Sequence, residues 1–247
     1  MAIWKLTMFI LVEIGIFAIG GSLLRKARDT RQPTELVFGL LLVTVAAGHA
    51  AMIFSAELSS VIGSGLAHHV SAVGALLVAG GFAALYLNAW RFYRPDSGWA
   101  LVLSGVASLA LLSNWTSMLL RGTVTAPGEG SRESLILLAL VCGALVWWGA
   151  ESLAYHREVR RREALGFADP LVATRFLMLA LSTLSFAGVA VIAIVSSAFL
   201  GHPARALPAF QAGMGFLAVV GVATGYCAFA PVEFYERLNS RPVTHQA

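Results

Sequence analysis

The sequence predicts an all-α fold, a polytopic bundle of seven transmembrane helices, and three observations support this prediction. First, 58% of the 247 residues are hydrophobic and 12% are charged, against roughly 45–50% and 25% in an average soluble domain. Second, apolar runs long enough to cross a bilayer recur along the whole chain. Third, none of these runs alternates polar and apolar residues as the strands of a membrane barrel do. Residues 1–247 are therefore expected to form a single membrane domain.

The seven expected spans follow the apolar runs in order. They cover residues 3–24, 35–57, 67–90, 98–120, 133–155, 171–199 and 207–230. At about 1.5 Å of rise per residue, a helix over each of these ranges can cross roughly 30 Å of hydrocarbon. A helix also satisfies its own backbone hydrogen bonds, which lipid cannot do. The connections are short, the longest being residues 121–132 and 156–170, so we expect no separate soluble domain.

The basic residues are divided unequally between alternate connections, and this predicts the orientation in the membrane. One side receives 13 of the 17 Lys and Arg residues, and the other side receives 4. Cytoplasmic loops carry an excess of Lys and Arg, so we predict that the N-terminus lies outside and the C-terminus in the cytoplasm. The basic cluster that follows the first span also favours a retained helix over a signal peptide. The expected location is the bacterial inner membrane.

Several classes of function are disfavoured by the sequence. The basic clusters lie between apolar runs, where topology signals belong, so no nucleic-acid partner is expected despite the net charge of +4. No H-E-x-x-H, G-x-S-x-G or P-loop motif occurs, and we expect no enzymatic activity. No cofactor is expected either. Retinal needs a Lys in the last span, which has none, and haem ligation would pair His49 with His68 or His69 at different depths.

Two stretches of the sequence resemble a known pattern. Residues Glu151 to Leu181 combine a basic run, a Leu-Gly-x-x-Asp-Pro turn and an Arg-Phe pair that opens the next span, and residues Arg91 to Ala100 weakly repeat this arrangement. The first stretch resembles a family of uncharacterised bacterial seven-helix membrane proteins. The layout is similar to the seven-helix input modules of some bacterial sensory kinases. This resemblance implies the fold and a sensory layout, and it carries over no catalytic residue.

The Asp-Pro turn can also be interpreted from its residues alone. Asp169 precedes Pro170 at the start of an apolar run, so we expect Asp169 to cap the next helix and Pro170 to occupy its first turn. Arg175 lies about one and a half turns further on, where its side chain can reach lipid phosphates. The region either anchors a helix among membrane lipids or docks a cytoplasmic signalling partner. The candidate partner-binding residues are Arg160, Arg161, Arg162, Asp169 and Arg175.

A carboxyl group lies midway along the first expected span. Glu13 is surrounded there by apolar residues, and a charge at that depth costs about 2.5 kcal/mol or more unless it is paired or hydrated. We therefore expect Glu13 to be protonated or hydrogen-bonded to a neighbouring helix. It either handles a ligand, an ion or a proton, or it holds helices together.

Four further groups are expected to converge near the outer membrane face. His49 and Glu57 lie eight residues apart and so face the same side of the second span, and His68 and His69 open the third. Imidazole and carboxylate can bind zinc or copper, but the spacing matches no metal motif and no metal site is predicted. The alternatives are a pH-sensitive polar pocket and ordinary interfacial histidines.

Bulky and small residues inside the spans predict how the helices pack. Trp148 lies too deep for an interfacial aromatic belt, so we expect it to fill the core or line a pocket. Gly80, Gly81, Gly221 and Gly225 predict close helix contacts, within the bundle or between subunits of a homo-oligomer. The full set of candidate ligand-binding residues is Glu13, His49, Glu57, His68, His69 and Trp148.

The leading functional hypothesis is a receptor-like or sensory membrane protein. A pocket between the first, second, third and seventh spans would receive a stimulus on the outer side, and residues 156–175 would pass the response to a cytoplasmic partner. A stimulus can transmit a signal only by binding two helix packings with different affinity. The alternatives are a small transporter or channel that uses Glu13 and His49, and a structural subunit of a membrane complex. The absence of an internal repeat in the sequence weighs against a transporter.

Overall fold

The computed structural model describes residues 2–31, 33–122, 124, 131–167, 169–200 and 207–230. Within these ranges the chain forms helices and turns and contains no strand. The helices are α1 (Ala2–Thr30), α2 (Pro33–Glu57), α3 (Ser59–Ile62), α4 (Ser64–Tyr93), α5 (Gly98–Arg121), α6 (Arg132–Ala164), α7 (Pro170–Phe199) and α8 (Pro208–Phe229). The all-α prediction is confirmed for the described part of the chain.

Six of these helices are long and apolar enough to cross a membrane, namely α2, α4, α5, α6, α7 and α8. Their length and composition indicate a multi-pass membrane protein. A helix is present at each of the seven predicted positions, and most predicted boundaries agree with the structure to within three residues. Residues 201–206 and 231–247, which carry three of the arginines used to predict orientation, lie outside the described residues.

Two helices continue further than the apolar runs that predicted them. Helix α1 extends through the first basic cluster, and α6 extends nine residues past position 155, so the predicted connection over residues 156–170 is mostly helical. This extension contains no Gly or Pro and carries ion pairs at helical spacing, Arg160 with Glu163 and Arg162 with Glu158. The prediction of a loop was wrong because it followed hydropathy alone. The four-residue helix α3 was also not predicted.

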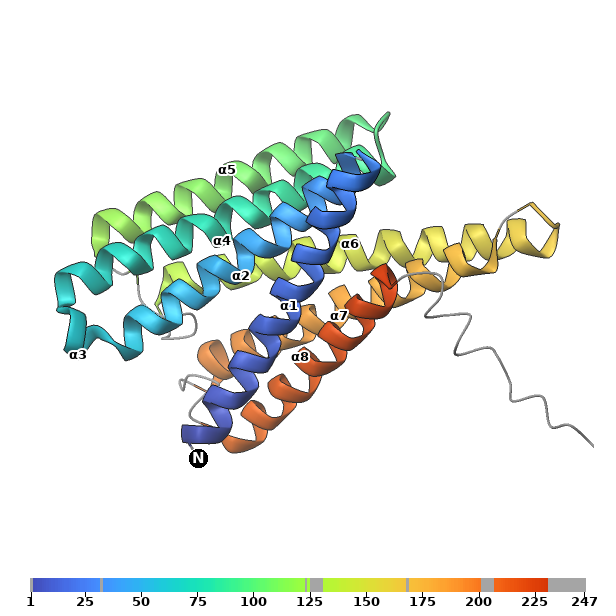
Figure 1. The fold of residues 1–247 in the computed structure, drawn as a ribbon. Coiled ribbons are helices and arrows are strands. Elements are labelled where there is room, and N and C mark those ends of the chain that lie inside the picture. The colour runs from blue at the N-terminus through green and yellow to red at the C-terminus, as the bar shows by residue number, and fades with distance from the viewer. Residues whose placement is uncertain are drawn as a thin grey trace, which may run out of the picture.

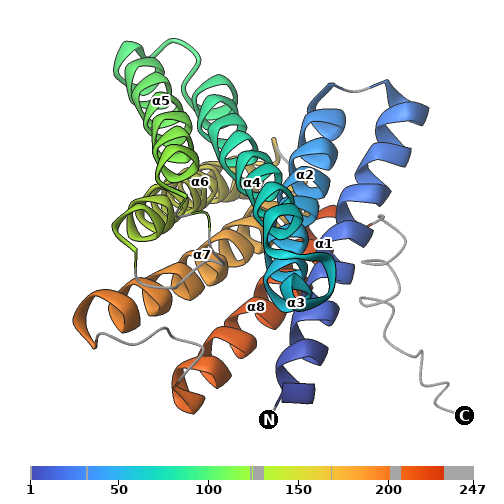
Figure 2. The ribbon, with the colours of Figure 1, turned by 90° about the vertical axis from the view of Figure 1, so that its left-hand side faces the viewer.

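The helices pack in a closed ring. Each one contacts the next in the order α1, α2, α4, α5, α6, α7 and α8, then α8 contacts α1, and a further contact joins α4 to α6. Figure 1 shows α2, α4 and α5 side by side in one layer, with α1 crossing from this layer to α8. In Figure 2, the N-terminal end of α1 lies beside α8, and the C-terminal end of α1 lies beside α2. The C-terminal end of α6 and the N-terminal end of α7 project together beyond the other helices (Figure 1).

The packed core lies mainly between α2, α4, α5 and α6. Its largest buried side chains include Leu111 and Trp148, at 0% and 1% exposure. Helices α2 and α4 cross at two glycines, and a Cβ on Gly48 would stand 2.5 Å from the carbonyl oxygen of Gly74. No side chain fits at such a crossing, because the obstacle is backbone. This crossing fixes the spacing of the two helices that form one side of the bundle.

Close contacts are present at three of the four glycines that predicted them. The Ser182 hydroxyl on α7 donates a hydrogen bond to the carbonyl oxygen of Gly221 on α8 at 2.7 Å. A Cβ on Gly225 would stand 2.9 Å from the same hydroxyl, and a Cβ on Gly81 would collide with a side chain of α2. Gly80 faces open space, so the prediction was wrong at that position.

Candidate functional site

A cavity of about 530 Å³ lies inside the ring of helices, between α1, α2, α4, α6, α7 and α8. Small-molecule sites typically have volumes of about 300–1,000 Å³ and mostly apolar walls. Here too the wall is mostly apolar. Its side chains with oxygen or nitrogen groups, apart from the indole of Trp148, are Glu13, His49, Glu57, Ser182, Thr183 and Gln211. No Lys or Arg is among the lining residues, and the acidic groups of the wall are Glu13 and Glu57.

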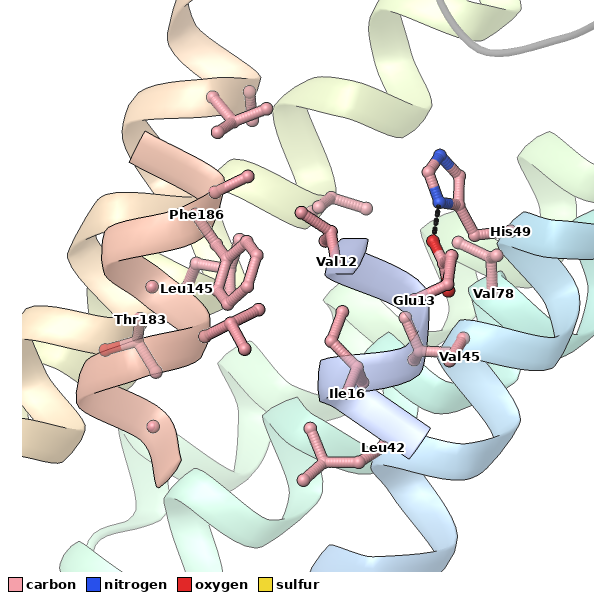
Figure 3. Close-up of a pocket in the computed structure, with 18 of the residues that line it drawn as sticks. Val12, Glu13, Ile16, Leu42, Val45, His49, Val78, Leu145, Thr183 and Phe186 are labelled. Atoms are coloured by element: carbon pink, nitrogen blue, oxygen red, sulfur yellow. Dashed lines mark hydrogen bonds and ion pairs between the residues drawn. The ribbon is translucent and has the colours of Figure 1, made fainter. Parts of the chain in front are cut away.

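Glu13 on α1 and His49 on α2 form the central polar contact of this cavity. The distance between Glu13 Oε1 and His49 Nδ1 is 2.5 Å, so a proton joins the two atoms whichever of them holds it. Glu13 is 6% exposed. Figure 3 shows the two side chains meeting between their helices, with Leu145 and Phe186 on the far side of the cavity. The prediction that Glu13 is hydrogen-bonded to a neighbouring helix is confirmed.

The hairpin of α1 and α2 brings these two side chains to the same depth. The connection between the helices is short, so they are antiparallel neighbours. At its turn, the carboxylate of Glu35 accepts hydrogen bonds from Lys26 Nζ at 2.5 Å and from Thr30 Oγ1 at 2.7 Å. These contacts fix the register of the hairpin, and the register places Glu13 opposite His49.

Two buried polar atoms of cavity-lining side chains have no hydrogen-bond partner among the described residues. They are the second carboxylate oxygen of Glu13, Oε2, and the indole nitrogen of Trp148, Nε1. Leaving such an atom unsatisfied costs about 1–3 kcal/mol. Trp148 is 1% exposed, and its ring contacts Phe38 and Tyr93 at centroid distances of 5.0 and 5.1 Å. The prediction that Trp148 fills the core or lines a pocket is confirmed, since its ring belongs to the packed core and also lines the cavity.

The other predicted ligand residues do not join the Glu13–His49 pair. Glu57 lines the cavity but is exposed, and His68 and His69 are not among the lining residues. The rings of the two adjacent histidines contact each other at a centroid distance of 5.9 Å. Within the described ranges, no three His, Cys, Asp or Glu residues form a group that could hold a metal ion. Of the four groups that were expected to converge at one membrane face, only His49 and Glu57 line the cavity.

The Asp-Pro turn is a capped helix start, as its residues predicted. Asp169 Oδ1 accepts a hydrogen bond from the backbone N–H of Leu171 at 2.8 Å, and Pro170 opens α7. The candidate partner-binding residues Arg160 and Arg162 form ion pairs on the surface of α6, while Arg161 is exposed. The capped turn closes the projecting ends of α6 and α7.

Arg175, for which the sequence suggested contact with lipid phosphates, also has a partner within the protein. It is half-buried, and its Nη2 donates a hydrogen bond to the carbonyl oxygen of Ala230 at 2.8 Å. Ala230 follows the last residue of α8, where helix carbonyls lack intrahelical partners and carry partial negative charge. Arg175 therefore ties the start of α7 to the end of α8. Only the tertiary arrangement reveals this contact.

Sequence reasoning missed two ion pairs near the ends of the spans. Arg94 Nε donates to Glu151 Oε1 at 2.9 Å, and Arg121 Nη1 donates to Glu133 Oε1 at 2.8 Å. Each pair joins α6 to the end of another helix, and the hydrogen bond with Glu151 raises the pKa of Arg94. The available signal was that each pair combines opposite charges close to predicted span ends on the same side of the membrane. Both pairs hold helices together outside the cavity wall.

No protein-family profile matches this chain, and neither the curated proteins nor the solved structures contain one with significant similarity to it. The class of protein therefore follows from the fold, which is that of a helical multi-pass membrane protein. Its most distinctive feature is the apolar cavity with one buried carboxylate–imidazole pair in its wall.

Proposed function

We propose that this chain is a receptor-like membrane protein that binds a small apolar molecule in the cavity and transmits its presence to the cytoplasm. The observation that carries the proposal is the cavity itself, an apolar space of about 530 Å³ whose lining residues include the buried Glu13–His49 pair. A preformed apolar pocket with a few polar groups is the usual form of a small-molecule site.

A route from the cavity to the cytoplasm is available through α6 and α7. Both helices contribute residues to the cavity wall, and both continue into the projecting ends. A ligand that prefers one packing of these helices over another would change the position or the mobility of the projecting ends. No separate output domain is needed for this step.

The proposed topology has seven spans, namely the six helices named above and α1. Helix α1 is long enough to cross a bilayer, and its exposed apolar side chains Ile10, Leu11 and Ile14 are suited to contact with lipid. The arginine-rich projecting ends belong in the cytoplasm by the positive-inside rule, which puts the N-terminus outside. The location is then the inner membrane of a bacterium.

The projecting ends carry a surface suited to a cytoplasmic signalling partner. Leu165 and Phe167 are 70% and 81% exposed at the tip, beside the exposed Arg161. Exposed apolar side chains bordered by charge are typical of protein–protein contact sites. Arg160, Arg162, Asp169 and Arg175 would act mainly by holding this tip in its conformation, since each is engaged in the contacts described above.

The test asks whether filling the cavity moves the projecting ends. Gly215 lines the cavity, and a Cβ there meets nothing within 4 Å, so Gly215→Phe adds a ring to the cavity without displacing backbone. Gly80→Phe is the matched control, because Gly80 has equally open space and does not line the cavity. Spin labels at positions 96 and 161, in full-length protein without its two native cysteines, report the distance between the α4–α5 turn and the tip.

We expect Gly215→Phe to shift the distance distribution measured by pulsed electron paramagnetic resonance in lipid nanodiscs, and Gly80→Phe to leave it as in the parent protein. Circular dichroism checks that all three proteins are equally helical. Three identical distributions would contradict the proposed coupling between the cavity and the projecting ends.

One observation favours a second candidate, a proton-coupled transporter or channel. Glu13 and His49 form a hydrogen-bonded titratable pair inside the bundle, and Glu13 Oε2 has no partner among the described residues. Titratable groups at such depth often mark proton pathways. Proteoliposomes loaded with a pH-sensitive dye provide the test. Proton flux in the wild type that disappears in Glu13→Gln would favour transport, and the absence of flux in both would favour the receptor.

A further inference from the structure

The shape of the cavity restricts what it can hold. On α2 the lining residues recur on one helix face from Phe38 to Glu57, and on α8 they recur from Gln211 to Phe229. At 1.5 Å per residue, these two stripes are about 28 and 27 Å long, close to the thickness of a bilayer core. A cavity whose lining follows two helices over that length is elongated, a shape that suits an extended hydrocarbon chain.

The polar groups and the aromatic groups of the cavity lie at different depths. Phe38 contacts the rings of Trp148 and Phe229 at one end of the cavity. His49 lies eleven residues further along α2, which places the Glu13–His49 pair about 16 Å from that aromatic end. The wall of α2 between these levels consists of Leu and Val together with Ala46. An occupant that satisfies both regions has a polar head and an apolar chain of about that length.

The charges in the wall select the type of head group. Two lining residues, Glu13 and Glu57, are carboxylic acids, one is an imidazole, and none is Lys or Arg. Glu13 Oε2 is buried and has no partner among the described residues. An ionised carboxylate or phosphate head has no hydrogen to donate to carboxyl oxygens and would be repelled wherever those groups are ionised. An ammonium or hydroxyl head donates hydrogen bonds, which carboxyl oxygens accept, and an ammonium also carries the charge opposite to a carboxylate.

We infer that the cavity binds a single-chain amphiphile whose head group donates hydrogen bonds, with a long-chain amine preferred, and that the head contacts Glu13 while the chain extends toward Trp148. This inference rests on the proposed function, because it takes the cavity to be a ligand site. It adds the chemical class of the ligand and the direction in which it lies.

The first experiment compares head groups on one twelve-carbon chain. Full-length protein in nanodiscs binds radiolabelled dodecylamine in a scintillation proximity assay, and unlabelled dodecylamine, dodecanol and dodecanoate compete with it. The shared chain cancels the partition of each probe into lipid, so differences report the head group. We expect dodecylamine to compete at least about tenfold better than dodecanoate, with dodecanol in between. Equal competition by the amine and the carboxylate would overturn the inferred class.

The second experiment locates the head group with matched variants. Glu13→Gln preserves the size of the side chain and removes its charge, so we expect the affinity for dodecylamine to fall about tenfold, to the level of dodecanol. Glu158→Gln makes the same change on an exposed residue outside the cavity wall and should alter the affinity less than about twofold, while Glu57→Gln tests the second carboxylic acid of the wall. A larger effect at Glu57 than at Glu13 would overturn the placement of the head. Circular dichroism establishes that all three variants are folded.

The variants Gly215→Phe and Gly80→Phe distinguish a failure of this inference from a failure of the proposed function. Gly215→Phe should abolish dodecylamine binding, and Gly80→Phe should leave it unchanged. If every probe binds equally well and Gly215→Phe abolishes all of the binding, the inferred head-group class is wrong and the cavity remains a ligand site. If Gly215→Phe has no effect on binding, the inference and the proposed ligand site are both wrong.

Discussion

The side of the bundle formed by α4, α5 and the adjoining face of α6 differs from the cavity side in how its buried polar groups are paired. On the packed side, the Asn114 amide donates to the Glu133 carbonyl oxygen, and the Tyr86 hydroxyl donates to that of Leu140. Trp115 Nε1 donates to the carbonyl oxygen of Ala72. Of the described side chains in this region, Trp90 has a buried nitrogen without a partner, and so does Trp148, which belongs to the packed core and also lines the cavity.

The cavity wall contrasts with this region in having a buried carboxylate oxygen, Glu13 Oε2, without a partner among the described residues. Paired polar groups inside a membrane bundle hold helices together. Unpaired ones cost free energy, and a function that uses them explains why they are retained. Paired polar residues are therefore structural, and unpaired ones are candidates for binding. Stability measurements on both sides of the bundle test this distinction.

The largest expected difference concerns glycines. Gly48→Ala would force a methyl group against the backbone of Gly74, and we expect it to lower the free energy of unfolding by about 2 kcal/mol. Gly215→Ala adds the same methyl group inside the cavity, where nothing lies within 4 Å. We expect this second change to be neutral or to stabilise by up to about 1 kcal/mol, because alanine favours the helix. Unfolding in detergent followed by circular dichroism measures both, and equal losses would contradict the contrast between the two sides.

A smaller difference is expected between two buried glutamates. Glu151 Oε1 accepts hydrogen bonds from Arg94 at 2.9 Å and from Trp147 at 3.3 Å. We expect Glu151→Gln to cost about 1 kcal/mol, because the pair loses its charge but Arg94 is half exposed. Glu13→Gln can still hydrogen-bond His49, so it should cost less than about half as much. The same unfolding assay compares them, and a larger loss at Glu13 would assign the Glu13–His49 pair to the structural class.

The positions of the helices could be predicted because lipid imposes a simple rule. Any long apolar run must be helical where it crosses the bilayer, so composition alone located α2 to within two residues. Local rules were equally effective, since the Asp169 cap depends only on neighbouring residues. The C-terminal part of α6 was missed because the prediction of span ends relied on hydropathy. Hydropathy ends where charge begins, whereas the helix continues on ion pairs such as that between Arg162 and Glu158.

The candidate site could be predicted only in part. A carboxylic acid in an apolar run is conspicuous, so Glu13 was found, and its hydrogen bond to another helix was expected. The cavity itself depends on how far α1, α2, α7 and α8 tilt apart, and a sequence pattern does not determine tilt. For that reason the sequence could not show that His49 lines the cavity whereas His68 and His69 do not. The contact of Arg175 with the end of α8 depends on the same tertiary arrangement.

The smallest expected effect concerns Ser182, which lies on the border between the two regions. Its hydroxyl donates to the carbonyl oxygen of Gly221, yet the residue also lines the cavity. We expect Ser182→Ala to cost about 0.6 kcal/mol, the average for such a bond between membrane helices. Ser185→Ala is the control on the same helix, because Ser185 forms no hydrogen bond with the described residues. It should change stability by less than about half that amount.

Binding distinguishes the two roles of Ser182. Since the carbonyl oxygen of Gly221 already takes its hydrogen, we expect Ser182→Ala to leave the competition between dodecylamine and dodecanoate as in the wild type. Weaker dodecylamine binding with unchanged stability would instead assign this hydroxyl to the ligand. The polar part of the site would then extend across the cavity from α1 and α2 to α7, and the border between the packed and the open side would run through the contact of α7 with α8.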